Sequence, residues 1–377
     1  MAKSKSNWKK RLRWIIHPLA IIAYIALLIS YLSPFTPPKS IWWISLFGLG
    51  YPIVFWSNLL LLVLLFIFYK NTFRWIVLGT LIIGLPLHTR YFALGGPKKV
   101  KPNKTAVSLM SYNVRLFDKY EWIGDEMFSP KDSILHLIKT EQPAILCLQE
   151  YLVDNSDNPH IQTEDLIAAN NYTYYHQRTV QEQRKLQFGL ATFSIYPIVN
   201  KGNVFKGEAQ DQFCIYTDIK VDNQIIRVYN MHLQSISFQK EDYQAFLSNE
   251  DSDFSRITRL KNILRKIKIA YAPRVEQAKK IIDHIAQSPY PVIACGDFND
   301  TPLSYVYNLF TSKLDDVFRH VGFGTGRTYA GKLPAGRIDY IFTSEEFRPL
   351  SYIIHYKVFS DHFAIAAKLE LSTFESD

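Results

Sequence analysis

The sequence predicts a mixed α/β domain of layered sheets and helices, preceded by an N-terminal anchor of transmembrane helices. Long apolar runs occupy most of the first 94 residues. From Ala106 onward, short β-rich runs alternate with amphipathic helical runs instead. We find no internal repeat or low-complexity segment, so this second part is expected to fold around one substantial core.

The apolar runs cover residues 14–32, 41–69 and 75–94. Each approaches or exceeds the ~20 residues that cross a bilayer. The second run is longer than one span needs, so a tilt or a break near Gly48–Pro52 is expected. We predict three transmembrane helices and an integral membrane protein of the bacterial inner membrane.

Domain boundaries follow from this change in composition. Residues 1–94 form the predicted anchor, and 95–105 read as a basic linker rich in Gly and Pro. Residues 106–372 form the predicted soluble domain. Six Lys or Arg residues precede Trp14 and favour a cytoplasmic N-terminus, which places this domain on the extracytoplasmic side. Basic residues after the third run oppose that orientation.

The charge distribution excludes a uniformly basic domain that coats nucleic acid. Residues 1–104 hold 14 of the 43 basic residues and none of the 34 acidic ones, so the remainder carries a net charge of −5. The three cysteines are too few for a disulfide framework, and each lies in an apolar run.

The soluble domain alternates predicted strands with single helices. Strands are expected at 106–114, 143–150, 172–179, 188–198, 213–221, 225–233, 291–298, 337–344 and 362–371, and helices at 132–141, 163–171, 273–287 and 304–312. Residues 235–272 interrupt this pattern with a long excursion whose second half is basic and amphipathic. Three interpretations of this second half are possible: an ordinary surface helix, a cover over the active site, or a contact with the membrane surface.

Polar side chains end several of the apolar strands, an arrangement that presents them at one edge of a rigid sheet. Each of these residues also has an ordinary structural explanation when it is considered alone. A carboxylate at a strand end is usually a solvated loop residue, a lone histidine is usually structural, and GDFN can be a turn. The set comprises Asn113, Glu150, His232, Asp297, Asn299, Asp339, Asp361 and His362.

Together these residues lie in SYNVR, LCLQE, FGLATFSIYPI, VYNMHLQS, CGDFNDTP, RIDYIF and SDHFAI, in that order. The series resembles the endonuclease/exonuclease/phosphatase superfamily, which includes deoxyribonucleases, AP endonucleases, neutral sphingomyelinases and inositol polyphosphate 5-phosphatases. The resemblance implies a four-layer α/β sandwich with two mixed β-sheets packed face to face and helices outside.

The resemblance also implies divalent-metal-dependent hydrolysis of phosphate esters, with Mg²⁺ or Mn²⁺. Asn113 and Glu150 match the metal-binding pair, and oxygen ligands of this kind suit Mg²⁺. Asp361 matches a position that orients the site or binds a second metal.

The remaining matches imply acid–base and phosphate-binding roles. Asp297 and Asn299 match the residues that orient and activate the attacking water. His362 matches the phosphate-contacting histidine, with Asp339 holding its ring. His232 matches a second phosphate-binding or leaving-group position.

The sequence does not decide between two classes of phosphodiester substrate. Departures from the 5-phosphatase and AP endonuclease motifs make those branches poor matches. A membrane-anchored nuclease-type hydrolase is the first interpretation, and a sphingomyelinase-like lipid headgroup phosphodiesterase is the alternative. A catalytically silent membrane scaffold is the remaining alternative. We predict a nucleic acid or phospholipid substrate and contact with the bilayer through the N-terminal helices, with no protein partner.

Overall fold

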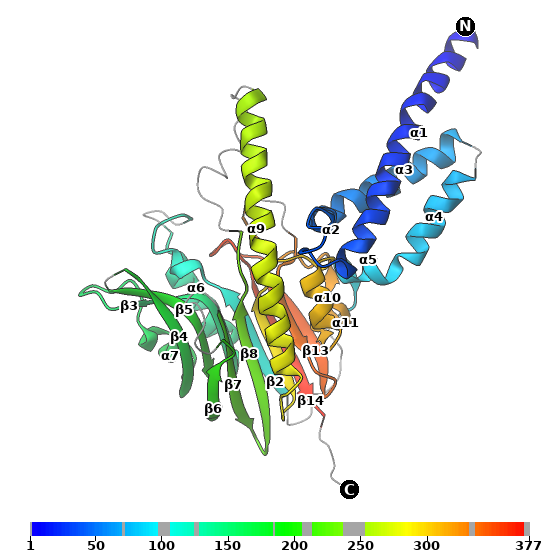
Figure 1. The fold of residues 1–377 in the computed structure, drawn as a ribbon. Coiled ribbons are helices and arrows are strands. Elements are labelled where there is room, and N and C mark those ends of the chain that lie inside the picture. The colour runs from blue at the N-terminus through cyan, green and yellow to red at the C-terminus, as the bar shows by residue number, and fades with distance from the viewer. Residues whose placement is uncertain are drawn as a thin grey trace. The chain divides into compact units, whose positions relative to one another are not determined.

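The structure is a computed structural model that describes residues 2–69, 72–96, 106–123, 128–183, 185–205, 213–236, 253–331 and 336–372. Most of the predicted linker and the first part of the excursion lie outside these residues. The chain divides into two compact units (Figure 1). The first holds Met1–Tyr91 with Asp300–Asn308, and the second holds Phe92–Asn299 with Leu309–Asp377.

The first unit is helical. Among the described residues, two helical stretches are long and apolar enough to cross a bilayer: Leu12–Phe35 with 24 residues and Tyr51–Phe68 with 18. The second apolar run divides at Gly50, two residues before Pro52 in the first turn of the next helix. Its helices are α1 (Ala2–Leu32), η1 (Ser33–Phe35), α2 (Ile44–Leu49), α3 (Tyr51–Phe68), α4 (Phe73–Ile83) and α5 (Leu85–Tyr91).

The third apolar run is not one continuous helix. It divides at Gly84, two residues before Pro86, into α4 with 11 residues and α5 with 7. Proline cannot donate the backbone hydrogen bond that would continue the helix, and glycine tolerates the break. Neither piece alone reaches the length of a bilayer span.

Residues Asp300–Asn308 follow the GDFN motif in sequence and belong to the helical unit. Arg90 donates from Nη2 to Asn308 Oδ1 at 2.9 Å, and its guanidinium lies 5.5 Å from the centre of the Tyr307 ring. Thr301 donates to the Gly48 carbonyl oxygen at 3.4 Å. This segment is therefore fixed by polar contacts with the helices.

The second unit contains, within the described residues, two six-stranded sheets and a short two-stranded ribbon. One sheet has the order β13-β14-β2-β3-β5-β4 and the other β10-β12-β9-β8-β7-β6, while β1 pairs with β11. The strands are β1 (Ala93–Leu94), β2 (Ala106–Asn113), β3 (Ile145–Asp154), β4 (Tyr174–Gln183), β5 (Leu186–Ser194), β6 (Ile198–Asn203), β7 (Phe213–Val221), β8 (Gln224–His232), β9 (Val292–Asp297), β10 (Asp315–Asp316), β11 (Phe323–Gly324), β12 (Asp339–Thr343), β13 (Phe347–His355) and β14 (Ala364–Leu371).

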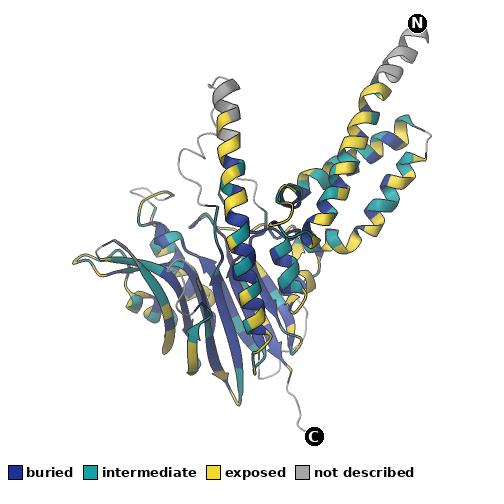
Figure 2. Cartoon of the chain, viewed as in Figure 1, coloured by how far each residue is buried: buried dark blue, intermediate teal, exposed yellow. Residues whose placement is uncertain are grey.

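The two sheets pack face to face through a common apolar core. Leu109 and Ile365 of the first sheet lie in one buried cluster with Val228 and Ile293 of the second. Figure 2 shows the buried residues concentrated in these sheets. The helices of this unit are η2 (Arg115–Asp118), α6 (Pro130–Glu141), α7 (Thr163–Asn170), α9 (Asp253–Ile285), α10 (Tyr305–Thr311, which the helical unit shares) and α11 (Val317–Val321).

Helices cover the outer faces of both sheets. Ile134 of α6 and Leu166 of α7 pack with outward-facing residues of β2, β3 and β5. On the other sheet, α9 lies over β8 (Figure 1). The Tyr229 hydroxyl of β8 is 2.8 Å from Nδ1 of His284 in α9. The predicted fold class, an α/β sandwich with two mixed sheets between helices, is confirmed.

Some predicted elements have different bounds. The expected strand 188–198 ends at Ser194, and the chain crosses through Pro197 to begin β6 in the other sheet. Strand β13 was not predicted. It contains Pro349 and lies at the edge of its sheet, where proline is tolerated.

Buried amides join the two sheets near the ends of their strands. A β-bulge in β3 places Gln149 and Glu150 opposite one residue of β5. Asn230 of β8 donates to the Leu148 and Ala191 carbonyl oxygens at 3.1 and 2.9 Å, and accepts from Gln149 Nε2 at 2.8 Å. These bonds satisfy buried polar groups and fix the register of one sheet on the other.

Gly296 lets β9 approach its parallel neighbour β8. Its φ is +138°, and a Cβ there would lie 1.9 Å from the Met231 carbonyl oxygen. The next residues in the two strands are His232 and Asp297, which are register partners. The glycine is therefore needed for the close pairing of the two strands that end in polar side chains.

The substitution Gly296→Ala is expected to destabilise the protein by on the order of 3 kcal/mol or more, because backbone must move and the φ is unfavourable for alanine. Thermal unfolding in detergent micelles measures this. The control is Gly79→Ala in α4, where a Cβ has open space and alanine is the better helix former. Equal melting temperatures for the two variants would contradict the close-approach argument.

Candidate active site

Four strand ends meet because of how the strands are directed. β2 and β3 run parallel, and so do β8 and β9, so their C-terminal ends lie at one edge of each sheet. Strand β12 is antiparallel to β9 and places Asp339 opposite Asp297. Strand β14 is antiparallel to β2, so the residues before it, including His362, lie beside the end of β2.

Asp297, at the end of β9, is the centre of the site and is 1% exposed. Its Oδ2 accepts from Asn113 Nδ2 at 3.1 Å and lies 3.5 Å from His232 Nε2 and 3.6 Å from His362 Nε2. Its Oδ1 accepts from the backbone N–H of Asn299 at 2.8 Å. A buried carboxylate surrounded by hydrogen-bond donors is oriented to act on a proton at a fixed point.

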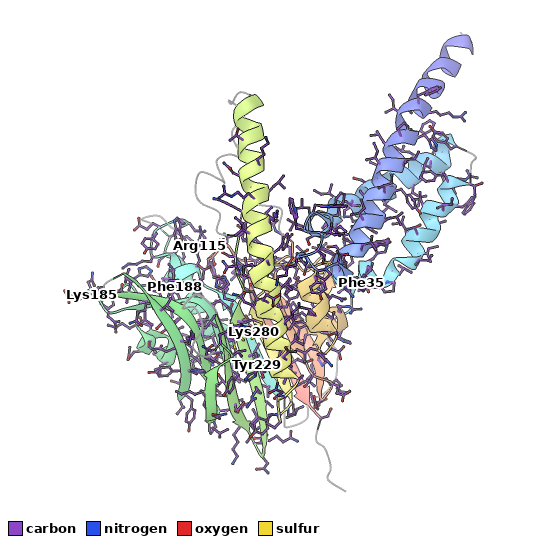
Figure 3. All side chains as sticks on the ribbon, in the orientation of Figure 1. Phe35, Arg115, Lys185, Phe188, Tyr229 and Lys280 are labelled. Carbon is purple, nitrogen blue, oxygen red and sulfur yellow. The ribbon has the colours of Figure 1, made fainter. Side chains whose placement is uncertain are left out.

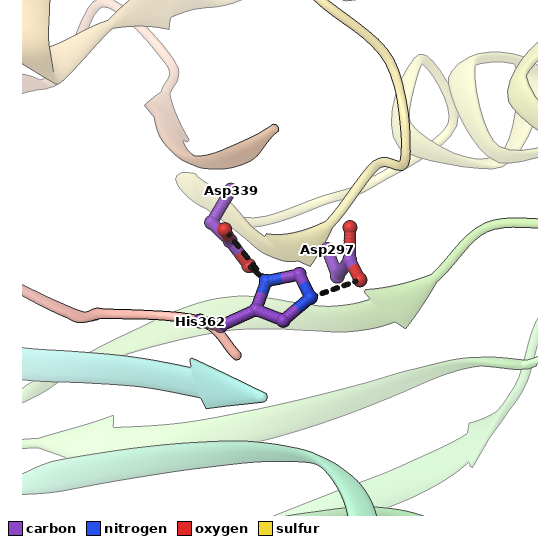
Figure 4. A group of neighbouring side chains, drawn as sticks. All are labelled: Asp297, Asp339 and His362. Carbon is purple, nitrogen blue, oxygen red and sulfur yellow. Dashed lines mark hydrogen bonds and ion pairs between the residues drawn. The ribbon is translucent and has the colours of Figure 1, made fainter. Parts of the chain in front are cut away.

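His362 and Asp339 form a buried dyad (Figure 4). Nδ1 of the ring lies 3.1 and 3.0 Å from the two carboxylate oxygens. Burial lowers the pKa of His362, but the charges of Asp339 and Asp297 outweigh it, so the pKa is well above the ordinary value for histidine. The dyad therefore favours an imidazolium whose Nε2–H points toward Asp297.

Glu150 lies beside this group because of the β3 bulge and its own positive φ of 49°. Its Oε1 accepts from Asn113 Nδ2 at 3.2 Å and lies 3.9 Å from His232 Nε2. About 30% of its side chain is exposed. Burial raises the pKa of this carboxyl, His232 opposes the shift, and the nearby Asp361 adds to it.

Asp361 lies next to the dyad histidine in sequence, on the opposite side of Asn113 from β3. Its Oδ2 is 3.5 Å from Arg115 Nη1. The preceding Ser360 donates to the Asn113 carbonyl oxygen at 2.8 Å and so joins the turn before β14 to the end of β2. The Asp361 carboxylate is therefore held within the same polar group.

The residues present fit a divalent cation of the Mg²⁺ type by their chemistry. Asp297, Asp339 and His362 form a group whose possible ligand atoms lie within 4.8 Å of one another. Both oxygens of Asp339 already face the His362 ring, so that side of the group is internally satisfied. Glu150 and Asp361 offer further carboxylate oxygens, the ligands that Mg²⁺ prefers.

Each of the predicted site residues lies in the described part of the chain. Asn299 differs from the others because its side chain donates to the Leu233 carbonyl oxygen at 3.0 Å and orients the loop. Sequence reasoning did not select Ser360, Thr328 or Arg115. Thr328 Oγ1 accepts from the Asp339 backbone N–H at 3.1 Å. Thr328 lies outside the motifs that the sequence analysis used. Arg115 stands two residues after Asn113 in SYNVR, so its position in this motif could have indicated that it lies near the site.

Comparisons with known proteins identify the family of the second unit. The model of the endonuclease/exonuclease/phosphatase family matches residues 110–362, two thirds of the chain. The chain belongs to this family. A second model, for a domain of unknown function, matches residues 10–91. No curated protein matches the sequence significantly.

The solved structures that match this chain are distant in sequence. An endonuclease/exonuclease/phosphatase from Beutenbergia cavernae is 17% identical, with 71% of this chain and 72% of that chain covered and a TM-score of 0.49. A family protein from Leptotrichia buccalis is 17% identical over 70% of this chain and 100% of its own, with a TM-score of 0.49. The human Nocturnin catalytic domain is 18% identical over 72% and 96%, with a TM-score of 0.48.

In metal-free buffer, Asp339→Asn is expected to lower the pKa of His362, because the nearest negative charge that stabilises the imidazolium is removed. The ring then loses its proton at a lower pH than in the parent protein. NMR titration of histidine ring signals, assigned with His362→Gln, measures the midpoint. His176 is the internal control, since burial and then Lys201 lower its pKa to about 4. An unchanged His362 midpoint would contradict the assigned role of Asp339.

Proposed function

We propose that the protein is a divalent-metal-dependent phosphodiesterase. The supporting observation is the group around Asp297: a buried carboxylate within 3.6 Å of Nε2 of both His232 and His362, with Asp339 behind the second ring. This family member therefore retains a base, proton donors and an orienting carboxylate in one place. Such a set disfavours a catalytically silent scaffold.

In this mechanism, Asp297 accepts the proton of the attacking water as the water oxygen bonds to phosphorus. Asn299 holds the aspartate through its backbone N–H. His362, with its ring fixed at Nδ1 by Asp339, donates from Nε2 to a phosphoryl oxygen that gains charge. His232, whose Nε2 also lies near Asp297 Oδ2, is the second proton donor and protonates the leaving oxygen as the ester bond breaks.

Electrostatics supports a cation. Four carboxylates gather with Arg115 where strand ends of the two sheets meet, and this concentration of negative charge repels an anionic phosphate. They are Glu150, Asp297, Asp339 and Asp361. We propose that Glu150, Asn113 and Asp361 hold Mg²⁺ or Mn²⁺. The ion would neutralise phosphoryl charge and favour departure of the leaving oxygen.

We also propose that residues 1–94 anchor the domain to a membrane. The two long apolar helical stretches support this. The basic head before Trp14 favours a cytoplasmic N-terminus and an extracytoplasmic domain at 106–372. Nucleic acid is the proposed substrate class. A lipid headgroup phosphodiesterase is the second candidate, favoured by the anchor alone.

The variants Asp297→Ala and His362→Ala are expected to lower kcat for phosphodiester hydrolysis by about 10²–10⁴-fold, because each removes a proton-transfer or charge-stabilising group. Nucleotide release from single-stranded and plasmid DNA with Mg²⁺ measures this. Circular dichroism and melting temperature show whether the variants stay folded. The control is Tyr174→Phe, at the start of β4 and away from the site. Substantial activity in either folded site variant would refute the assignment.

Chelation with EDTA is expected to abolish hydrolysis, and added Mg²⁺ or Mn²⁺ to restore it. Glu150→Gln is expected to raise the Mg²⁺ concentration for half-maximal activity by at least ~10-fold, because a neutral amide is a weaker ligand than a carboxylate. Metal titrations of activity compare it with Glu164→Gln in α7. Full activity in EDTA would contradict metal dependence.

A further inference from the structure

The chain leaves the site through a left-handed stretch of backbone. Immediately after β2, φ is 45° at Arg115, 55° at Leu116, 53° at Phe117 and 57° at Asp118. None of these residues is glycine, and each costs about 1–2 kcal/mol in this conformation. Strain of this kind persists only where surrounding contacts enforce it, and it gathers at functional positions.

Buried contacts hold the strained turn in place. Leu116 and Phe117 are 7% and 0% exposed and belong to the core under α6 and α7. The Phe117 ring packs edge-on against Tyr151 with centroids 6.1 Å apart, and its carbonyl oxygen lies 2.8 Å from His160 Nε2. The turn is therefore a rigid part of the domain.

The turn presents two aromatic rings to solvent. The Asp118 carboxylate accepts from the backbone N–H groups of Trp122 at 2.9 Å and Ile123 at 3.1 Å. Tyr120 and Trp122 are 39% and 37% exposed, and their ring centroids are 5.2 Å apart. Exposed aromatic rings on a rigid support are suitable for stacking against a planar ligand.

Arg115, which is labelled in Figure 3, contacts both Trp122 and the carboxylate of Asp361. Its guanidinium carbon lies 4.2 Å from the centre of the Trp122 ring, and Nη1 lies 3.5 Å from Asp361. Its backbone N–H donates to Asn113 Oδ1 at 3.1 Å. A phosphate contact and a stacking surface are thus built next to the group around Asp297.

We propose that Trp122 stacks a nucleobase of the substrate, with the Tyr120 ring tilted by 52° beside it, while Arg115 contacts a phosphate of the same strand. An unpaired base is required for stacking, so the substrate class is single-stranded nucleic acid. This inference rests on the proposed phosphodiesterase function and specifies its substrate.

The same contacts disfavour a phosphocholine headgroup. A quaternary ammonium binds the face of an aromatic ring, and Arg115 already places a positive charge over the Trp122 ring. A second cation there would be repelled. A nucleobase is neutral and planar, and its phosphates are attracted by the same guanidinium.

Binding of a fluorescent oligothymidylate tests the proposal. It is measured by anisotropy with Mg²⁺, using the full chain in detergent and the His362→Ala background so that the strand stays uncut. Trp122→Ala is expected to raise Kd by about 5- to 100-fold, and Trp122→Phe to restore most of the affinity. Tyr174→Ala is the matched control, because Tyr174 is also 37% exposed but lies at the start of β4.

Salt dependence separates the phosphate contact from stacking. Arg115→Ala is expected to reduce the slope of log Kd against log salt by about 0.7, the value for one phosphate contact on a single strand. Trp122→Ala is expected to leave that slope unchanged. A purely structural role for Arg115 would lower affinity without changing the slope.

An unchanged Kd in Trp122→Ala would overturn the proposal, and so would a background protein that fails to bind the strand. Release of phosphocholine from sphingomyelin vesicles that Trp122→Ala weakens would assign the ring to a lipid headgroup instead. Tryptophan-dependent binding of a strand that the parent protein does not cut would refute the proposed hydrolysis while leaving the recognition site intact.

Discussion

The gathering of acidic side chains where strand ends of the two sheets meet is the constraint on which the rest of the site depends. Like charges repel strongly where water is excluded, so Asp297 and Asp339 are stable together only because donors lie between and around them. The raised pKa of His362, against the effect of burial, is the direct consequence. Asn113 supplies further neutral donation to Asp297 and Glu150. The negative charge that these donors do not neutralise would attract a divalent cation in the proposed reaction.

The two-sheet architecture makes this arrangement rigid. The group around Asp297 draws on both sheets, so its geometry depends on how one sheet sits on the other. The buried hydrogen bond that Gln149, next to Glu150 in sequence, donates to Asn230 helps to set that relation. The β3 bulge begins after Leu148, whose carbonyl oxygen accepts from Asn230, and it contains Glu150 of the site. One irregularity in β3 thus serves both the packing of the sheets and the chemistry.

The proposed substrate contacts extend outward from the same residues. Asn113 donates into the site with its amide nitrogen and accepts from Arg115 with its oxygen. The strained turn that follows carries the aromatic rings, and its buried residues keep them in place. Recognition and hydrolysis would therefore share one rigid support. In the other direction along the chain, the residues after Asn299 enter the helical unit.

The sequence by itself determined the fold class, the family and the set of polar strand ends, because apolar periodicity and motif order are local properties of the chain. It predicted most strands, but not β13 or the crossing at Pro197, since the sheet edge that tolerates Pro349 exists only after folding. The sequence predicted that Glu150 ends a strand, but it did not predict the β-bulge that orients the Glu150 side chain toward the site. Only the tertiary structure decided that Asp297 is the centre of the group, that Gly296 permits it, and that Arg115 lies over Trp122. These are contacts between segments far apart in sequence or across a left-handed turn, where packing overrides local preference.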